Sequence, residues 1–264
     1  MRPKHILITS QGLSADITQE IADDLALANS LFIPQQNVNS IGLGKKGIIY
    51  AVRSIILRTF FKHQLSDQLF SMLDGDYIYL HKYTISLINH LYNLNSRFNF
   101  SEDYSTIYWE NEDSVLILTQ PRVTLEIPTD EELECFVPNN ESAGSFSTDI
   151  EELKDALNFF EGFYAGSVWK PIRFEISAGK EVELKYTHPS ANITKALSAS
   201  GTQDGTFALD SETLKKTLAK VKDKRDERDE PLTAEFTYED GRLGVHCTIG
   251  DSYDIIFALL TEEE

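Results

Sequence analysis

The residues of this chain with the clearest chemical potential are basic side chains gathered in residues 204–225, which read DGTFALDSETLKKTLAKVKDKR. Leu214, Leu218 and Val221 fall at positions i, i+4 and i+7, which predicts a helix with one apolar stripe and an N-cap at position 210 or 211. The basic residues lie away from that stripe: Lys215, Lys216, Lys220, Lys222, Lys224 and Arg225. We therefore expect a helix that packs with one face and presents ammonium groups with the other, although a lysine-rich face is also typical of plain solvated surface.

Other residue types that carry chemistry are scattered. The six histidines form no metal-type spacing, and we expect His246 to be a polar surface residue and His188 to lie in a turn. Cys135 and Cys247 make neither a disulfide framework nor a metal motif. No GxxxxGK[ST] phosphate loop and no GxSxG nucleophile motif occurs. These observations predict no catalytic residues, no metal and no cofactor, and they indicate a protein that is not an enzyme.

Composition and charge limit the classes of function. The chain has 264 residues, 41% hydrophobic and 25% charged, which is typical of a soluble globular protein with one large or two ordinary domains. The formal net charge of −18 excludes non-specific adhesion of the whole surface to DNA. Two opposite hypotheses fit this charge: the protein imitates nucleic acid, or it confines positive charge to one small region.

No segment predicts a membrane span or a leader. The densest apolar stretch, residues 47–61, is interrupted by Arg53 and Arg58, both costly in a bilayer. The first ten residues have too short an apolar run for a signal peptide. With only two cysteines, a reducing, cytoplasmic setting is the expectation.

The hydrophobic pattern predicts the same order of elements in both halves of the chain. Each half runs helix, hairpin, further strand, Asp-Gly turn, short strand leading directly into a second helix, then about three strands. The Asp-Gly turns are at residues 74–75 and 204–205, with helices predicted at about 16–28, 83–93, 149–160 and 211–221. A composition change with three prolines separates the halves. We therefore predict an N-terminal domain at residues 1–120, a connector at 121–147 and a C-terminal domain at 148–264.

This order resembles that of the DNA polymerase sliding clamps, which include the bacterial β clamp and proliferating cell nuclear antigen. FALDSETLKKTLAKV resembles the short strand and second helix of a clamp domain, and IEELKDALNFFEGF resembles the opening helix. EFTYEDGRLGVHCTIGDSYDIIFALL resembles the closing strands, and YSTIYWENED before a proline-rich connector is similar to the two-domain clamps of T4-like bacteriophages. The resemblance implies an α+β fold with two clamp-like domains per chain, each with two helices packed on antiparallel sheets.

The resemblance also implies a function and partners. Six clamp domains close a ring, so two per chain imply a homotrimer around double-stranded DNA. Edge strands at residues 115–118 of one copy and 193–199 of the next would continue the outer sheet. Such a sliding clamp, or processivity factor, tethers DNA polymerase and other replication proteins, is placed by a clamp loader, and works in the cytoplasm, that of the host cell if the chain is phage-encoded.

By the same resemblance, basic residues would face DNA inside the ring. They are Lys215, Lys216, Lys220 and Lys222, followed by Lys154, Lys82 and Arg97. Lys154, Lys82 and Arg97 are equally compatible with solvated surface. The first helix departs from the family's pattern, because it carries Asp16, Glu20, Asp23 and Asp24 and no basic residue.

Clamp partners insert a short hydrophobic peptide beside the connector and the C-terminal tail. Carried over to this chain, the pocket residues are Val123, Leu125, Ile127, Phe257, Leu259 and Leu260. The alternative is that these are ordinary core and connector residues.

Two other functions remain open from the sequence. The first is an acidic DNA mimic that inhibits a DNA-binding protein, for which the basic cluster of residues 215–225 would be unhelpful. The second is a polymerase accessory factor with the clamp fold but without a ring. Oligomeric state separates the second from a ring, and retention on DNA separates the mimic from both.

Overall fold

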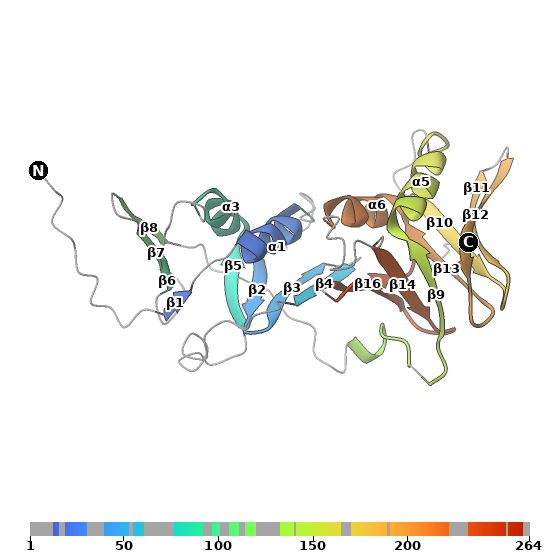
Figure 1. Cartoon of the computed structure of the whole chain (residues 1–264), viewed down its shortest axis with the longest axis horizontal. Helices are drawn as coiled ribbons and strands as arrows, with labels where there is room; N and C mark the ends of the chain where they lie inside the picture. The colour runs from blue at the N-terminus through green and yellow to red at the C-terminus, as the bar shows by residue number, and fades with distance from the viewer. Residues whose placement is uncertain are drawn as a thin grey trace, which may run out of the picture. The chain divides into compact units, whose positions relative to one another are not determined.

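We analysed a computed structural model of the 264-residue chain (Figure 1). The residues described here are 13–15, 19–30, 40–52, 55–60, 77–91, 97–100, 106–110, 114–119, 133–139, 141–164, 170–188, 191–221, 232–251 and 253–260. Among them, no helix has the length and apolar character needed to cross a membrane.

The first half of the chain contains two described helices. They are α1 (Gln19–Ser30) and α3 (Lys82–Leu91). The described strands of this half are β1 (Leu13–Ala15), β2 (Ser40–Gly44), β3 (Gly47–Val52), β4 (Ile55–Phe60), β5 (Tyr77–His81), β6 (Arg97–Phe100), β7 (Thr106–Glu110) and β8 (Val115–Thr119).

The second half repeats this order. Its helices are α5 (Ile150–Glu161) and α6 (Ser211–Lys220). Its strands are β9 (Gly144–Asp149), β10 (Pro171–Ile176), β11 (Glu181–His188), β12 (Ala191–Ser200), β13 (Gly205–Asp210), β14 (Thr233–Tyr238), β15 (Gly244–Ile249) and β16 (Tyr253–Ala258). In each half a strand and helix precede three strands, and a further strand leads into a second helix before three more strands. The predicted repeat and the α+β fold class are confirmed, and residues 144–147 of the predicted connector belong to β9.

The chain divides into two compact units. One takes residues 1–50 and 61–126, and the other takes residues 51–60 and 127–264. Both units contain two helices in contact with each other, α1 with α3 in the first and α5 with α6 in the second. The first unit has the antiparallel sheet β1-β6-β7-β8 and the pairs β5-β2 and β2-β3.

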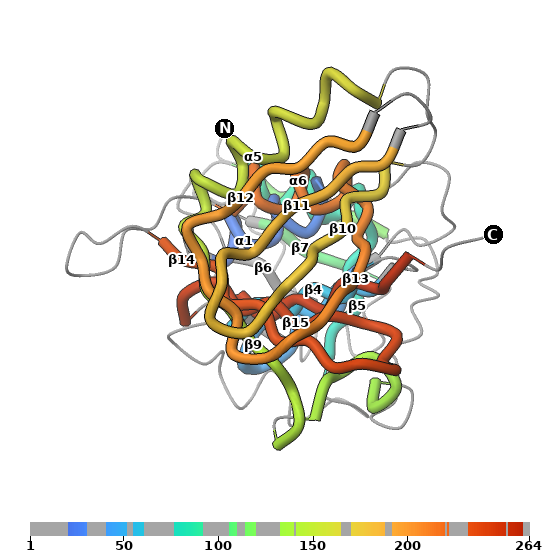
Figure 2. The backbone as a smooth tube through the Cα atoms, turned by 90° about the vertical axis from the view of Figure 1, so that its right-hand side faces the viewer, coloured from blue at the N-terminus to red at the C-terminus, as the bar shows by residue number. Residues whose placement is uncertain are grey.

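The second unit has two antiparallel sheets whose inner faces form one core. Their strand orders are β12-β11-β10-β13 and β4-β16-β15-β14-β9. Phe174 of the first sheet stacks on Phe207 with ring centroids 4.7 Å apart, and Phe146 of the other stacks on Phe236 at 5.0 Å. Phe146 and Phe174 are 6.1 Å apart, so the aromatic cluster joins both sheets. Figure 2 shows β10 to β13 side by side.

One strand of this core comes from the first half of the chain. β4 pairs antiparallel with β16, with Leu57 opposite Ile255 and Ile55 opposite Phe257. These four side chains are buried. The fourth strand of the first repeat therefore completes a sheet whose other members are the first strand and the last three strands of the second repeat.

Strand ends and helix starts coincide because a carboxylate caps each helix of the second unit. The Asp149 side chain accepts from the N–H groups of Glu151 and Glu152 at 2.8 and 3.1 Å. Asp210 accepts from the N–H of Thr213 at 2.9 Å, so the predicted cap is Asp210. The negative charge of each aspartate also interacts favourably with the helix dipole. Because the capping residue is the last residue of the strand, the helix begins without an intervening loop.

The structure corrects the interpretation of the Asp204-Gly205 dipeptide as a tight turn. Gly205 is the first residue of β13 and lacks the positive φ found at Gly241, the glycine of the turn between β14 and β15. Gly205 is needed instead because the buried ring of Tyr238 lies against its Cα. Tyr238 in turn donates its hydroxyl hydrogen to the carbonyl of Gln203 at 2.6 Å.

Gly205→Ala is expected to destabilise the protein by about 1–3 kcal/mol, because the new Cβ would lie 2.8 Å from Cδ2 of Tyr238 and closer still to Cε2. Urea unfolding measures this difference. Gly162→Ala is the matched control, since nothing lies within 4 Å of its Cβ position and its φ of −64° suits alanine. We expect a change within about 0.5 kcal/mol there. Equal midpoints for both variants would contradict the packing argument.

Candidate nucleic-acid interface and partner cavity

The lysine-rich helix α6 has the predicted two faces. Leu214 and Leu218 are fully buried and Val221 is 3% exposed. Lys216 is exposed and Lys215 is half-buried on the opposite side. Figure 1 shows α6 beside α5. The apolar stripe thus fixes which lysines point away from the core.

Both described lysines of this face are paired with carboxylates of the same chain. Lys215 Nζ donates to Glu161 at the end of α5, and Lys216 Nζ lies 2.6 Å from Glu212 Oε1. Lys170, which precedes β10, reaches the other oxygen of Glu212 at 3.0 Å. Sequence reasoning missed Lys170, because only the β10–β13 pairing brings it to α6; its position directly before the Pro171 strand was the available signal. The helix face is therefore a network of alternating charges.

These carboxylates are held in the charged form. Hydrogen bonding and charge from Lys215 lower the pKa of Glu161 below its ordinary value. Hydrogen bonds from Lys216 and then Lys170 lower the pKa of Glu212. At neutral pH the pairs are ionic, so an incoming phosphate competes with a carboxylate for each ammonium group.

The other predicted DNA-facing residues occupy different positions. Lys154 lies on α5 and pairs with Glu151 at 2.6 Å. Lys82 begins α3, with its Nζ 5.4 Å from the ring centroid of Tyr83. Arg97 is on strand β6, and Lys220 ends α6. Lys222 lies outside the described residues. The structure brings Lys215 and Lys216 together and leaves Lys154 on the neighbouring helix.

The acidic first helix is less exposed to solvent than its composition suggests. Asp24 of α1 is only 4% exposed, on the same helix as the buried Ile21, Leu25 and Ala28. Asn29 of α1 donates to Ser86 of α3 at 3.2 Å. Asp16 lies outside the described residues. At least one acidic residue of this helix is thus part of the packed layer.

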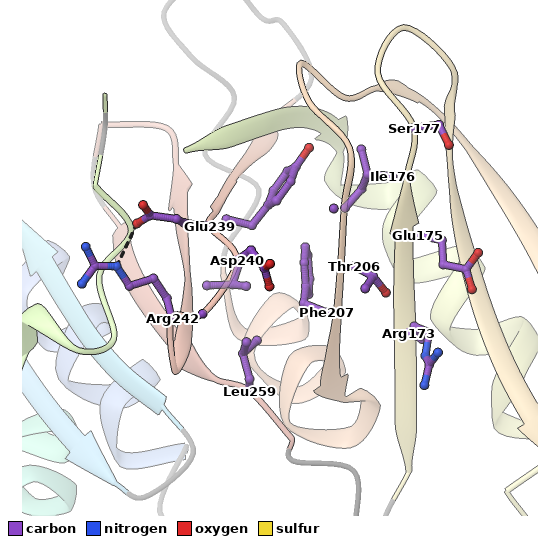
Figure 3. A pocket seen from close by; sticks show the side chains of 14 residues that line it. Arg173, Glu175, Ile176, Ser177, Thr206, Phe207, Glu239, Asp240, Arg242 and Leu259 are labelled. Carbon is purple, nitrogen blue, oxygen red and sulfur yellow. Dashed lines mark hydrogen bonds and ion pairs between the residues drawn. The ribbon is translucent and has the colours of Figure 1, made fainter. Parts of the chain in front are cut away.

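The second unit also contains a cavity of about 590 Å³ (Figure 3). It lies between β10, β13, the β14–β15 hairpin and the residues after β16. Apolar lining comes from Ile176, Phe207, Tyr238, Val245 and Leu259, and polar lining includes Arg173, Glu175, Thr206, Asp240 and Arg242. Figure 3 shows Phe207 and Leu259 between β13 and the hairpin. An apolar floor with a charged rim suits a peptide with one apolar anchor.

The hairpin wall of this cavity is fixed by Glu239. Its carboxylate accepts from the Asn139 N–H at 2.8 Å, from the Ser142 hydroxyl at 2.5 Å and from Arg242 Nε at 2.8 Å. Arg242 also donates to the carbonyl of Glu134 at 2.8 Å. Hydrogen bonds from Asn139, Ser142 and Arg242 lower the pKa of Glu239 to about 2. This carboxylate therefore holds Asn139 and Ser142 against the hairpin.

The predicted peptide-pocket residues are distributed unevenly around this cavity. Leu259 lines it. Phe257 is 2% exposed and belongs to the core, and Leu260 donates its N–H to the carbonyl of Ala208 at 2.9 Å. Val123, Leu125 and Ile127 lie outside the described residues. Sequence reasoning missed Phe207 and Arg242, whose roles depend on the meeting of β13 with the hairpin.

Groups with catalytic potential are few in the described part of the chain. His246 is half-buried and paired through Nε2 with Asp254 on the adjacent strand. Cys247 is fully buried, which raises the pKa of its thiol well above the ordinary value and keeps it protonated. Within the described ranges no cluster of three or more His, Cys, Asp and Glu residues is arranged for a metal.

The fold is that of the DNA polymerase sliding clamps. The sliding clamp of Pseudomonas aeruginosa DNA polymerase superposes with a TM-score of 0.71 at 12% identity, covering 98% of this chain and 69% of that one. The DNA polymerase III β subunit of Thermotoga maritima gives 0.70 at 11% identity, covering 99% and 69%. The β subunit of Streptococcus pyogenes DNA polymerase gives 0.67 at 13% identity, covering 96% and 66%. The predicted resemblance is confirmed as a likeness of fold.

These likenesses extend along nearly all of this chain but only part of the others. The chain spans about two thirds of the length of the solved clamps. Neither a protein-family model nor a curated protein sequence matches it. Any binding partner of this chain therefore has to be inferred from its own residues.

Glu239 gives a pH dependence whose sign follows from its pKa. A pKa of about 2 in the folded state against an ordinary 4.5 means that the unfolded chain takes up the proton first as pH falls. Wild type should melt at a higher temperature than Glu239→Gln at pH 7. This gap should shrink as pH falls from about 4.5 towards 2. Calorimetric melting at several pH values measures it. Asp240→Asn, which changes the neighbouring carboxylate, is the control. If the difference in melting temperature between wild type and Glu239→Gln persists at pH 2, ionisation of Glu239 is not the source of the pH dependence.

Proposed function

We propose that this chain is a DNA sliding clamp that encircles duplex DNA as a ring of identical copies and tethers a polymerase to it. The carrying observation is the clamp fold with an open strand edge on each sheet that would face another copy. The protein acts by topology and needs no chemistry of its own. A clamp loader would place it, in the cytoplasm of the host cell if the chain is phage-encoded.

The pairing inside one copy supports assembly of several. β4, the fourth strand of the first repeat, pairs with β16, the last strand of the second. The equivalent strands left over are β8, the last strand of the first repeat, and β12, the fourth strand of the second. Among the described strands, β8 ends its sheet beyond β7 and β12 ends its sheet beyond β11. The same pairing between copies would use both edges.

Unprotected edges of this kind call for a partner. Val115 and Ile117 of β8 are 51% and 57% exposed. A short strand with exposed β-branched apolar residues and unpaired backbone groups is prone to pair with another chain. Addition of β12 from a second copy satisfies this edge, and repetition of the contact closes a ring if the rotation is right.

Weak electrostatic contact suits movement along DNA. Lysines such as Lys215 and Lys216 already contact carboxylates, so each phosphate contact replaces an internal ion pair and gains little. The acidic remainder of the surface repels phosphate. Retention then rests on closure of the ring, and low affinity per contact leaves the ring free to slide.

The cavity beside Leu259 is the proposed site for a partner's peptide. Phe207, Val245 and Leu259 would receive an apolar side chain, and the rim carboxylates would favour a basic residue next to it. Polymerase and other replication proteins would share this site in turn. Val123, Leu125, Ile127, Phe257 and Leu260 remain predicted members of the same region.

The mass of the assembly in solution tests how many copies form the proposed ring. Light scattering at micromolar concentration should give about 90 kDa, three times the 29.9 kDa chain, if six clamp domains close the ring. A stable dimer or larger closed oligomer would contradict the trimer but keep a ring. A clean monomer at low salt would sink the ring and leave the non-ring accessory factor and the DNA mimic.

Lys215 and Lys216 of α6 are expected to contribute to retention of the protein on DNA. Lys215→Ala with Lys216→Ala should weaken retention on nicked circular DNA and reduce the slope of log affinity against log salt by about 1 for each phosphate that the variant no longer neutralises. Lys185→Ala is the matched control, because Lys185 on β11 is likewise paired, with Glu175 at 2.5 Å and Glu183 at 2.9 Å. Equal losses for both would place DNA elsewhere, and no retention of wild type on circular DNA would favour the mimic.

A further inference from the structure

The open edge of β12 has a defined end. β12 pairs with β11 continuously from Ala191, opposite His188, to Leu197, opposite Val182. The register then shifts, and Ser200 pairs with Glu181. Such a bulge bends and twists a strand, so the flat part of β12 is residues 191–197. Figure 2 shows β12 beside α5.

A carboxylate from α5 forms a hydrogen bond with a backbone amide at this end of β12. Glu152 Oε1 accepts from the N–H of Ser198 at 2.7 Å. A hydrogen bond to an ionised group is stronger than one between neutral groups. A strand added to β12 would have to displace Glu152 to use the Ser198 amide. Charged groups placed at a sheet edge are a known means of ending strand addition.

An aromatic patch lies next to the flat part of β12. Phe159 and Phe163 of the α5 region are 47% and 42% exposed, with ring centroids 5.7 Å apart. Lys195 of β12 places its Nζ 5.8 Å from the centroid of Phe159. These side chains cover the helix side of the edge, and they leave apolar surface that a second chain would bury.

β8 matches this edge in length and in chemistry. It has five residues, and the flat part of β12 has room for them. Leu116 and Leu118 pair with Trp109 and Ile107, whose side chains are buried, so both leucines lie on the inner face of their sheet. They are half-buried, since nothing lies beyond them in the described sheet. In the β4–β16 pair the same inner positions bring aliphatic and aromatic side chains together.

We propose that Glu152 is a positioning residue that stops strand addition at Leu197, so that β8 of a second copy pairs antiparallel within residues 191–197 and its inner leucines meet Phe159. This inference rests on the proposed ring of identical copies. It adds the register of the contact, which the repeat alone does not determine. Without a stop, β8 slides by two residues at little cost, because both strands keep the same side chains on the same faces.

Cysteine cross-linking reads out this register. In a Cys135→Ser background, which removes an exposed thiol and keeps the buried Cys247, Ile117→Cys is combined with either Thr194→Cys or Ala196→Cys, the position opposite residue 117 after a slide by two residues. Mixing isotopically labelled with unlabelled copies identifies disulfides between chains by mass spectrometry. Each pair is tested with wild-type Glu152, Glu152→Ala and Glu152→Gln. The control is Glu151→Ala, which removes the neighbouring carboxylate that pairs with Lys154.

With Glu152 present, the 117–194 disulfide should form and the 117–196 disulfide should be about tenfold rarer. Glu152→Ala should raise the 117–196 product by about the same factor. Glu152→Gln keeps an acceptor oxygen but loses the charge, so its yield of the 117–196 product should lie between those of wild type and Glu152→Ala. Glu151→Ala should behave like wild type. Circular dichroism and light scattering establish that each variant is folded and assembled.

Two failures have different meanings. If the copies assemble and the 117–196 product is unchanged by Glu152→Ala, Glu152 does not set the register and the inference is overturned while the ring stands. A monomer that forms neither disulfide overturns the ring itself. A dominant 117–196 product in the presence of Glu152 also excludes the proposed stop.

Discussion

The fold depends on one strand pairing, that of β4 with β16. β4 is formed by residues from the first half of the chain, yet it lies in a sheet whose other described strands in this unit belong to the second repeat. Its inward residues Ile55 and Leu57 are buried opposite Phe257 and Ile255. Without β4, the β16 edge would expose a row of unpaired amides and carbonyls beside an apolar inner layer. The β4–β16 pairing uses one pair of equivalent strands from the two repeats. It leaves β8 and β12 at the ends of their described sheets, each with one neighbouring strand, so this pairing determines which edges are open to another copy.

The described surface of α5 and α6 carries paired positive and negative charges and is not uniformly basic. Four lysines near α5 and α6 contact Glu151, Glu161 or Glu212. Exposed ion pairs of this kind contribute little to stability. They do lower the free positive charge that phosphate would meet. In a ring, this is compatible with function, because closure rather than affinity keeps the protein on DNA. In an open molecule the same surface would bind DNA poorly at physiological salt.

Sequence periodicity was sufficient for the helices and for the repeated order of the elements. Leu214, Leu218 and Val221 predicted the buried face of α6, and the helix ranges predicted in the second half correspond to α5 and α6. Contacts between segments that are distant in the sequence could not be predicted from the hydrophobic pattern. The Asp204-Gly205 dipeptide read as a turn, whereas its glycine is required by Tyr238, over thirty positions later. Lys170 and Glu239 gain their roles from pairings across 42 and about 100 positions (212 minus 170; 239 minus 139), and no local spacing encodes these.

In the proposed ring, the β12 edge would have to pair with another copy and still avoid pairing with other chains. The surroundings of β12, rather than its own residues, suit both requirements. Lys195 places a charge on the flat part, which disfavours stacking in a continuous fibril but is tolerated beside Phe159, where the ring face attracts the ammonium group. The bulge and Glu152 end the flat part at Leu197. A limited edge accepts a short strand such as β8 and offers little to a longer one. Selectivity for a second copy then follows from the limits of the edge as much as from its attraction.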